Sequence, residues 1–252
     1  MRKSKYLVLN SFYFDFNDDL TDIINVKESL NKQNILDLSR FDKIKIIKKD
    51  QFIECKNINF VYLPISINKI YEASFFENKI QILDLSKCLK LKLIDPSCFE
   101  HNQLKQLKLP QNIEIIGEFA FYINQIEILD LSNCIKLKNI NNFAFEKNQI
   151  KQLKLPNNIE EIECSAFANN QIESLDLSNY KKLKDIYKSA FSKNPLKEIK
   201  ILNDIDINYS YDDDYKYDLW NRFVKYYNNN NKKSGDYKYE NDEWKWYPLK
   251  KK

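Results

Sequence analysis

A fixed period of 46 residues dominates this sequence. Three Leu-Pro pairs lie 46 residues apart, and three Leu-Ser pairs keep the same spacing. The Leu-Pro pairs begin at Leu63, Leu109 and Leu155, and the Leu-Ser pairs begin at Leu85, Leu131 and Leu177. A period of this kind is typical of a solenoid, in which each unit buries its apolar face against its neighbours. The period therefore predicts the architecture much more closely than it predicts a partner.

Each 46-residue period contains two similar units, one of 24 residues and one of 22. The units are marked by seven phenylalanines: Phe52, Phe75, Phe99, Phe121, Phe145, Phe167 and Phe191. Ile or Leu lies eight residues before each of them, and Ile lies five residues before. From the second unit on, Ser, Cys or Ala directly precedes the Phe. This recurrence predicts core positions that repeat from coil to coil.

These units resemble the leucine-rich repeat of the bacterial surface-antigen (BspA-like, treponemal) subclass, which reads roughly L-x-x-L-x-L-P-x-x-I-x-x-I-x-x-x-A-F-x-x-C/N. Residues 107–124 match that pattern at nearly every position, and the resemblance covers about residues 35–202. It implies a right-handed solenoid with a parallel β-sheet on the concave face, short strands and helical turns on the convex face, and mostly binding roles. One departure is the Gly after the second Ile, which survives only as Gly117. We therefore expect the other turns to be less tight.

Three regions are predicted. Residues 1–33 are expected to form an N-terminal cap with a short helix near residues 22–31, and residues 34–202 the repeat array. Residues 203–252 change in composition and are expected to form an α+β C-terminal cap, because both ends of a solenoid need covering. Apolar residues at helical spacing predict an amphipathic helix near residues 215–228. Alternating aromatic residues between Tyr237 and Trp246 predict a β-hairpin after it.

An asparagine follows each repeat phenylalanine after three residues in six units. An amide at the same place in every coil can hydrogen-bond the turn backbone of its own and the neighbouring coil, which satisfies buried N–H and C=O groups. Cys55 takes this position in the first unit. We assign a structural role to this Asn ladder, which comprises Asn78, Asn102, Asn124, Asn148, Asn170 and Asn194.

The strand of each unit carries one central residue that should face outward. Alternation in residues 81–86 places Leu83 and Leu85 in the core and Ile82 and Asp84 outside. The corresponding outward row is Asp37, Tyr62, Asp84, Lys108, Asp130, Lys154, Asp176 and Lys200, and its members from Tyr62 on are the candidate partner-binding residues. We interpret the row as a self-paired ladder with each Asp between two lysines, worth roughly 0.2–1 kcal/mol per exposed pair. The alternative is an acidic row that binds cations or a basic peptide.

The sequence gives little support to an enzymatic function. The one histidine, His101, occupies an exposed and variable position, and two glycines cannot supply a Gly-rich phosphate loop. Cys88 and Cys134 share one repeat position, which holds Phe41 and Tyr180 in other units, so packing is favoured over a disulfide or a zinc site. Five unclustered cysteines suggest a reducing compartment. We expect no catalytic residue, no metal and no cofactor.

The remaining signals concern partner and location. A net charge of +4 from nearly balanced charges gives no support for nucleic acid as a partner. The sequence contains no run of 18 apolar residues, so it predicts no membrane span. The N-terminal apolar stretch resembles only a weak signal peptide, because Asn10 and Ser11 interrupt it. We expect a monomer that binds a protein through the concave face in the cytoplasm, or in host cytoplasm if the chain is viral. A surface adhesin that binds host protein or matrix stays open as an alternative. So does nucleic-acid binding through the basic, aromatic tail.

Overall fold

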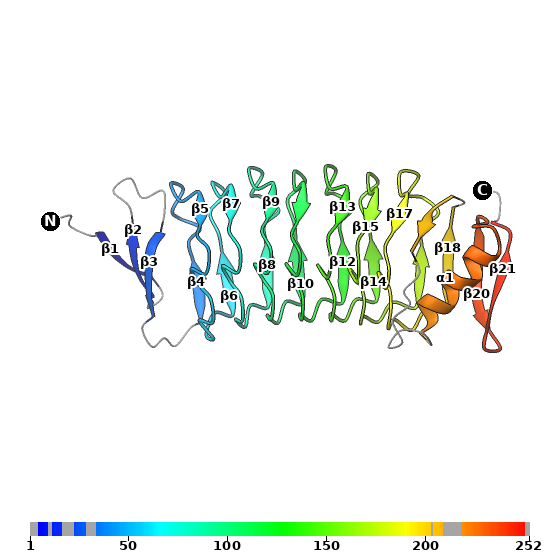
Figure 1. Ribbon diagram of the computed structural model, residues 1–252. Coiled ribbons are helices and arrows are strands. Elements are labelled where there is room, and N and C mark those ends of the chain that lie inside the picture. Colours follow the sequence, from blue (N-terminus) through cyan, green and yellow to red (C-terminus); the bar gives the residue numbers. More distant parts are fainter. Residues whose placement is uncertain are drawn as a thin grey trace.

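The computed structural model describes residues 5–9, 12–16, 23–28, 34–202, 204–208 and 218–249. Its main body is a row of coils stacked side by side, with a small sheet at the N-terminal end and a helix and hairpin at the C-terminal end (Figure 1). Each coil contributes two short strands, and the strands in each row run parallel to one another. The parallel-strand solenoid predicted from the period is therefore confirmed.

The first row of strands forms what we call the strand face. It comprises β4 (Ile35–Asp37), β6 (Phe60–Tyr62), β8 (Ile82–Asp84), β10 (Gln106–Lys108), β12 (Ile128–Asp130), β14 (Gln152–Lys154), β16 (Ser174–Asp176) and β18 (Glu198–Ile201).

The second row lies on the other side of each coil and consists of two-residue strands. It comprises β5 (Ile46–Ile47), β7 (Lys69–Ile70), β9 (Leu93–Ile94), β11 (Ile115–Ile116), β13 (Asn139–Ile140), β15 (Glu161–Ile162), β17 (Asp185–Ile186) and β19 (Asp206–Ile207).

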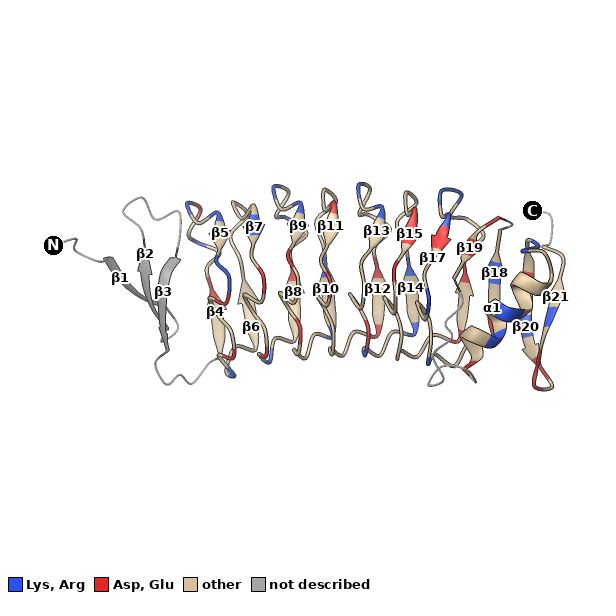
Figure 2. Cartoon of the chain, in the orientation of Figure 1, with Lys and Arg blue, Asp and Glu red and all other residues tan. Residues whose placement is uncertain are grey.

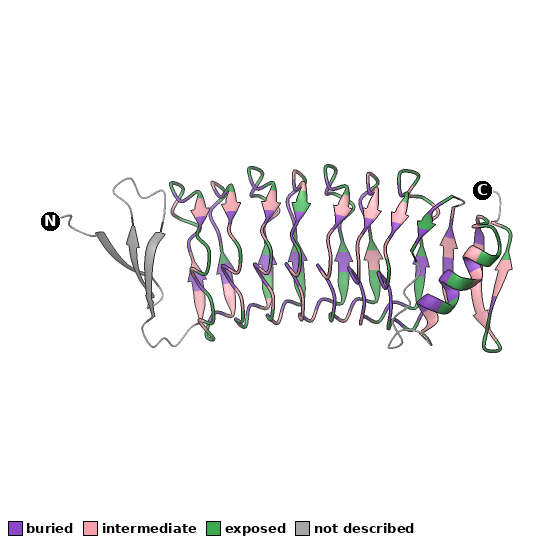
Figure 3. Ribbon diagram, in the orientation of Figure 1, coloured by how far each residue is buried: buried purple, intermediate pink, exposed green. Residues whose placement is uncertain are grey.

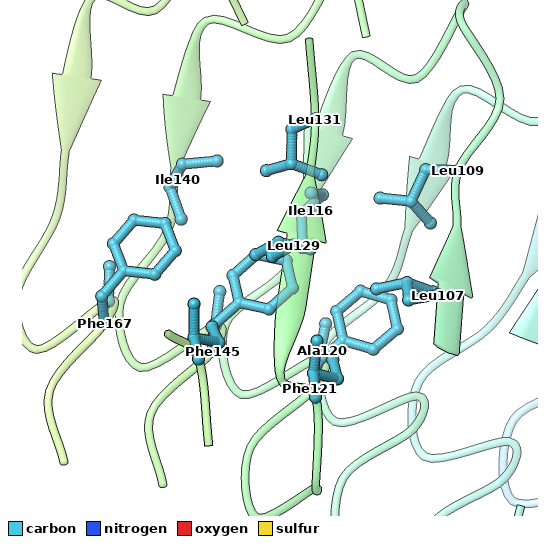
Figure 4. Packing of buried hydrophobic residues seen from close by; sticks show 14 of the residues in the cluster. Leu107, Leu109, Ile116, Ala120, Phe121, Leu129, Leu131, Ile140, Phe145 and Phe167 are labelled. Atoms are coloured by element: carbon cyan, nitrogen blue, oxygen red, sulfur yellow. The ribbon is translucent and has the colours of Figure 1, made fainter. Parts of the chain in front are cut away.

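The core is a continuous stack of the seven repeat phenylalanines. Neighbouring rings from Phe52 to Phe191 have centroids 5.0 to 5.6 Å apart and are nearly parallel. Figure 4 shows three of these rings in line, with leucines of the strand face and isoleucines of the second row around them. Ala144, directly before Phe145, is fully buried, as are the other alanines at this position. The small residue lets the coils approach closely enough for the rings to stack.

The chain turns sharply on either side of each repeat phenylalanine with almost no help from glycine. In one coil, Phe143 and Lys147 flank Phe145 with φ of 58° and 54°, and the same two positions are left-handed around each of the other six repeat phenylalanines. Gly117 is not among the residues with positive φ. A Cβ on Gly117 would instead lie 2.6 Å from the backbone nitrogen of Pro96 in the preceding coil. This glycine therefore serves close packing between coils, and the expected link between glycine and turn tightness is wrong.

The asparagines of the Asn ladder hydrogen-bond the backbone of neighbouring coils. The side-chain amide of Asn124 donates to the carbonyl of Phe99 at 2.9 Å, and its oxygen accepts the N–H of Leu104 at 2.9 Å. The same donor and acceptor pattern toward the preceding coil recurs at Asn102, Asn148, Asn170 and Asn194. The first rung is incomplete, because the Asn78 side-chain oxygen has no hydrogen-bond partner among the described residues. In that preceding coil, the Asn57 N–H turns back to the carbonyl of Cys55.

The N-terminal segment differs from its prediction. The strands β1 (Lys5–Leu9), β2 (Phe12–Phe16) and β3 (Ile23–Glu28) form an antiparallel sheet. The helix expected near residues 22–31 is therefore wrong where the structure describes that segment. Ile23, Ile24 and Val26 are β-branched and favour a strand. Residues 22 and 29–31 lie outside the described residues.

A helix and a β-hairpin follow the repeat array at the C-terminal end. Helix α1 (Leu219–Asn229) precedes the hairpin of β20 (Gly235–Glu240) and β21 (Glu243–Tyr247), and β20 pairs antiparallel with β18. The helix begins later than expected because Asp218 caps it by accepting the N–H of Asn221; residues 215–217 lie outside the described residues. The Trp220 ring lies 5.0 Å from Phe191 and covers the end of the phenylalanine stack. The limits of the two caps, at residues 33 and 202, stay predictions.

Candidate binding surface on the strand face

The strand face alternates as the sequence predicts. In β8 and β12, Leu83 and Leu129 are buried, while the residues on either side of them are exposed (Figure 3). Tyr62, Ile82 and Ile128 expose 53%, 41% and 59% of their surface, which is high for large apolar side chains. Among the predicted partner-binding residues, Tyr62, Asp84, Lys108, Asp130, Lys154 and Asp176 are exposed, whereas Lys200 is partly covered. The structure thus brings the candidate residues onto one surface.

The charged residues of the outward row form separate Asp–Lys ion pairs and not a continuous ladder. Lys108 Nζ lies 3.6 Å from Asp84, and Lys154 Nζ lies 3.1 Å from Asp130. Figure 2 shows acidic colour on β12 and basic colour on the neighbouring β14. Lys200 instead pairs with Glu198 at 3.2 Å. Within the described array, no ion pair joins Lys108 to Asp130 or Lys154 to Asp176. The prediction that each Asp lies between two paired lysines is therefore wrong.

The strand pairing explains this grouping. Strands β8 and β10, β12 and β14, and β16 and β18 each pair over three residues, and in each case the step between them is 24 residues. No backbone pairing joins β10 to β12 or β14 to β16, where the step is 22 residues. The longer step thus places an Asp strand directly beside the following Lys strand. The alternation of unit length was the signal in the sequence that could have predicted these breaks.

Each aspartate of the row also closes the turn after its own strand. The Ser132 N–H donates to Asp130 Oδ1 at 3.0 Å, and the Ser132 hydroxyl donates to the same oxygen. The hydrogen bond from the Ser132 hydroxyl, with the other bonds from Ser132 and Lys154, lowers the pKa of Asp130. The recurring Leu-Ser pairs are thereby explained, since Ser39, Ser86 and Ser178 bond the preceding Asp in the same way. One carboxylate oxygen therefore serves the turn, which favours a structural role for the Asp residues.

A hollow of about 620 Å³ opens on the strand face between β10 and β12, at the first of the two breaks. Its apolar lining includes Leu107, Leu109, Ile128 and Cys134. Its polar lining is Ser86, Lys105, Gln106, Lys108, Glu127, Asp130 and Asn133. The sequence did not predict this hollow. It combines an apolar floor with charged margins, which is the usual make-up of a site that receives one side chain of a partner.

Most of the C-terminal aromatic side chains are buried or contact cationic side chains of this same protein. Tyr237 and Trp244 are buried. The Lys233 ammonium lies 3.4 Å from the centre of the Trp246 ring, and the Arg222 guanidinium lies 4.9 Å from that of Tyr239. Ring faces that are buried or covered by cations cannot stack on bases. This part of the chain therefore gives little support to the nucleic-acid alternative.

Other chemistry is sparse in the described residues. They hold no group of three His, Cys, Asp or Glu side chains placed to bind a metal ion, and none of their five cysteines forms a disulfide. His101 is exposed and lies beside Glu100 and the rings of Phe76 and Tyr122. None of the helices seen in the described ranges has the length and apolar character needed to span a bilayer.

A match to a protein-family model agrees with the architecture. A family model described as "BspA type Leucine rich repeat region" matches residues 22–139 and 116–212 in six copies. A leucine-rich repeat protein from Bacteroides ovatus has a similar solved structure, with 16% identity and a TM-score of 0.42 over 80% of this chain and 67% of that one. A leucine-rich cell surface protein from Faecalibacterium prausnitzii shows 16% identity and a TM-score of 0.42 over 79% of this chain and 55% of that one. This chain thus spans only part of the length of either. No curated protein matches the sequence.

Proposed function

Because the chain belongs to the BspA-type leucine-rich repeat family, we propose that it is a non-catalytic, monomeric module that binds another protein through the strand face. Repeat arrays of this kind present extended surfaces for partners. Fold alone does not determine function, so the proposal depends on the surface itself.

The observation that carries the proposal is the exposure of Ile128 at the edge of the hollow. This side chain stands on a regular strand whose neighbouring Leu129 is buried, so its position is fixed by the core. Tyr62 and Ile82 extend the exposed apolar surface toward the N-terminal end, between charged residues. Exposed apolar side chains inside a polar margin are the usual anchors of protein interfaces.

The test compares two isoleucines on opposite sides of neighbouring coils. Ile128→Asp alters the strand face, whereas Ile115→Asp alters the second row, where Ile115 exposes 47% of its surface. Both variants and the unaltered protein serve as bait in quantitative affinity capture from cells of the native source. We expect Ile128→Asp alone to lose the captured protein. Equal loss with Ile115→Asp, or full retention with Ile128→Asp, contradicts the assignment to the strand face.

We further propose that the module acts at a cell surface, ahead of the cytoplasmic location expected from the sequence. The family connection supports this, because the repeat type is that of bacterial surface antigens. The cysteines at the repeated core position do not oppose a surface location. Burial raises the pKa of the Cys88 and Cys134 thiols to about 11, so these thiols stay protonated and poorly reactive even in an oxidising environment.

Location is tested on intact cells of the native source with a membrane-impermeant amine-reactive label. Lysines are abundant on the solenoid surface, so an external protein should react before lysis. Labelling only after lysis supports the cytoplasmic module instead. An abundant cytoplasmic protein of the same cells serves as the control for leakage.

A further inference from the structure

The two breaks in the strand face differ in one residue. At the break between β14 and β16, the Tyr180 hydroxyl accepts the N–H of Leu155 at 3.0 Å. Tyr180 belongs to the coil of β16 and Leu155 to the coil of β14, so this side chain reaches back across the break. Its ring packs against the hydrophobic core. The chain thus fills its own second break with a phenol.

Cys134 takes the place of Tyr180 at the first break, one period earlier in the sequence, and Leu109 takes the place of Leu155. A thiol is too short to cross the gap, and Leu109 N–H forms no hydrogen bond within the described array. The 620 Å³ hollow lies at this place, with Leu109 and Cys134 both in its lining. The first break therefore has a space for a side chain and an N–H donor without a partner, whereas at the second break Tyr180 fills the space and accepts the N–H.

The corresponding position between β6 and β8 holds Cys88, but that step is not equivalent. Phe60 and Ile82 still pair there, and the Cys88 thiol contacts the carbonyl of Pro64 at 3.7 Å. The break between β10 and β12 keeps no paired residue.

We infer that the hollow between β10 and β12 receives a tyrosine side chain of the partner protein, whose hydroxyl accepts the N–H of Leu109. This inference rests on the proposed binding role of the strand face and names the chemistry of the contact. The ring would lie over Leu107 and beside Ile128, whose exposed surface gives it an apolar wall.

The charge of Lys105, at the margin of the hollow, indicates which residue lies next to the partner's tyrosine. Lys151 and Lys197 pair with Glu127 and Glu173 at 3.0 and 2.9 Å, one 24-residue step earlier in each case. The corresponding residue for Lys105 is Gln81, and Lys105 forms no ion pair among the described residues.

The opposite charges at the hollow are already engaged. Glu127 and Asp130 are held by Lys151 and Lys154, so the margin carries one uncompensated positive charge, at Lys105. The partner's tyrosine should accordingly lie next to an Asp or Glu.

The experiment uses small phenols on the full chain and needs no identified partner. Amide resonances are followed by NMR during titration with 4-methylphenol, and with toluene as the probe that lacks the hydroxyl. We expect 4-methylphenol to shift the Leu109 amide in a saturable manner and toluene to leave it in place. Absence of a saturable Leu109 shift with 4-methylphenol overturns the inference.

Two reciprocal variants make the test specific. Cys134→Tyr should fill the hollow from within and abolish the Leu109 shift, whereas Tyr180→Cys should open a second site whose phenol response appears at the Leu155 amide. If Cys134→Tyr does not fold, the phenol response at the Leu155 amide of Tyr180→Cys still tests the inference. An unchanged Leu109 response in folded Cys134→Tyr, or no response at Leu155 in Tyr180→Cys, contradicts the assignment.

The charge requirement is tested with two dipeptides. N-acetyl-aspartyl-tyrosine amide should bind several-fold more tightly than N-acetyl-lysyl-tyrosine amide, and Lys105→Gln should remove that preference. Equal binding of the two dipeptides to the unaltered protein overturns the acidic neighbour. Loss of partner capture by Ile128→Asp without any phenol response would leave the proposed function standing and reject only the tyrosine site.

Discussion

The side-chain amide of Asn148 donates a hydrogen bond to the carbonyl oxygen of Phe121, 2.9 Å away in the preceding coil. Its side-chain oxygen accepts the N–H of Ile126 from that same coil at 3.1 Å. One buried side chain thus satisfies a backbone donor and a backbone acceptor that neither strand row reaches. The Asn ladder therefore joins coils at a third place, beside the ring stack.

Asn148→Ala should lower the free energy of unfolding by about 1–3 kcal/mol, because it leaves the Ile126 N–H buried without a partner. It also removes the shorter of the two side-chain hydrogen bonds to the Phe121 carbonyl, which keeps only the bond from Asn124. Chemical denaturation measures the change. Asn157→Ala, at an exposed turn position, is the control and should stay within about 0.5 kcal/mol of the unaltered protein. Similar stabilities for the two variants would contradict the role assigned to the ladder.

Gly117→Ala should also destabilise the array, by about 1–3 kcal/mol, because the added Cβ meets the backbone of Asp95 and Pro96 and the coils must move apart. Asn141 holds the equivalent position one coil later. Asn141→Ala should therefore change the stability by less than about 0.5 kcal/mol. Thermal unfolding of both variants tests this, and an unchanged melting temperature for Gly117→Ala would refute the close-packing account.

The sequence predicts the repeating core well, because the positions of Phe145, Ala144 and Asn148 meet nearly the same local requirement from coil to coil. It predicts the face of each strand for the same reason, since burial of Leu83 fixes the direction of Asp84. The breaks in the strand face were missed because backbone pairing depends on the length of whole coils. The hollow was missed because it depends on a single exchange, Cys134 for Tyr180, whose meaning appears only when Tyr180 is seen to reach Leu155.

Charge coupling on the strand face should be confined to paired strands. Lys154→Asp would place two carboxylates together at Asp130, while Asp176 lies across a break, so the effect is smaller than a row of three acidic residues would give. A double-mutant cycle with Asp130→Lys and Lys154→Asp should yield a coupling of about 0.2–1 kcal/mol. It should decline in high salt, because both side chains are exposed.

The control for that prediction is a second cycle across the break, with Lys154→Asp and Asp176→Lys. Its coupling should be near zero. Equal coupling energies in the two cycles, measured by chemical denaturation at low ionic strength, would argue for a continuous ladder after all.

The turn closed by Ser132 should make stability depend on pH through Asp130. The Ser132 hydroxyl is the main cause that lowers the pKa of this carboxyl in the folded protein, so the ionised form is favoured by folding. The resulting stabilisation is present above about pH 4, the ordinary range for Asp, and is lost as the pH falls through the lower folded-state value. Ser132→Ala should raise the pKa of Asp130 and reduce the stability at neutral pH, and its difference from the unaltered protein should vanish in acid. Carboxyl NMR titration together with urea denaturation across this range measures both effects.

Ser132→Thr keeps the hydroxyl and should preserve the low pKa. If Asp130 titrates identically in Ser132→Ala and Ser132→Thr, the lysine and not the turn governs this carboxylate.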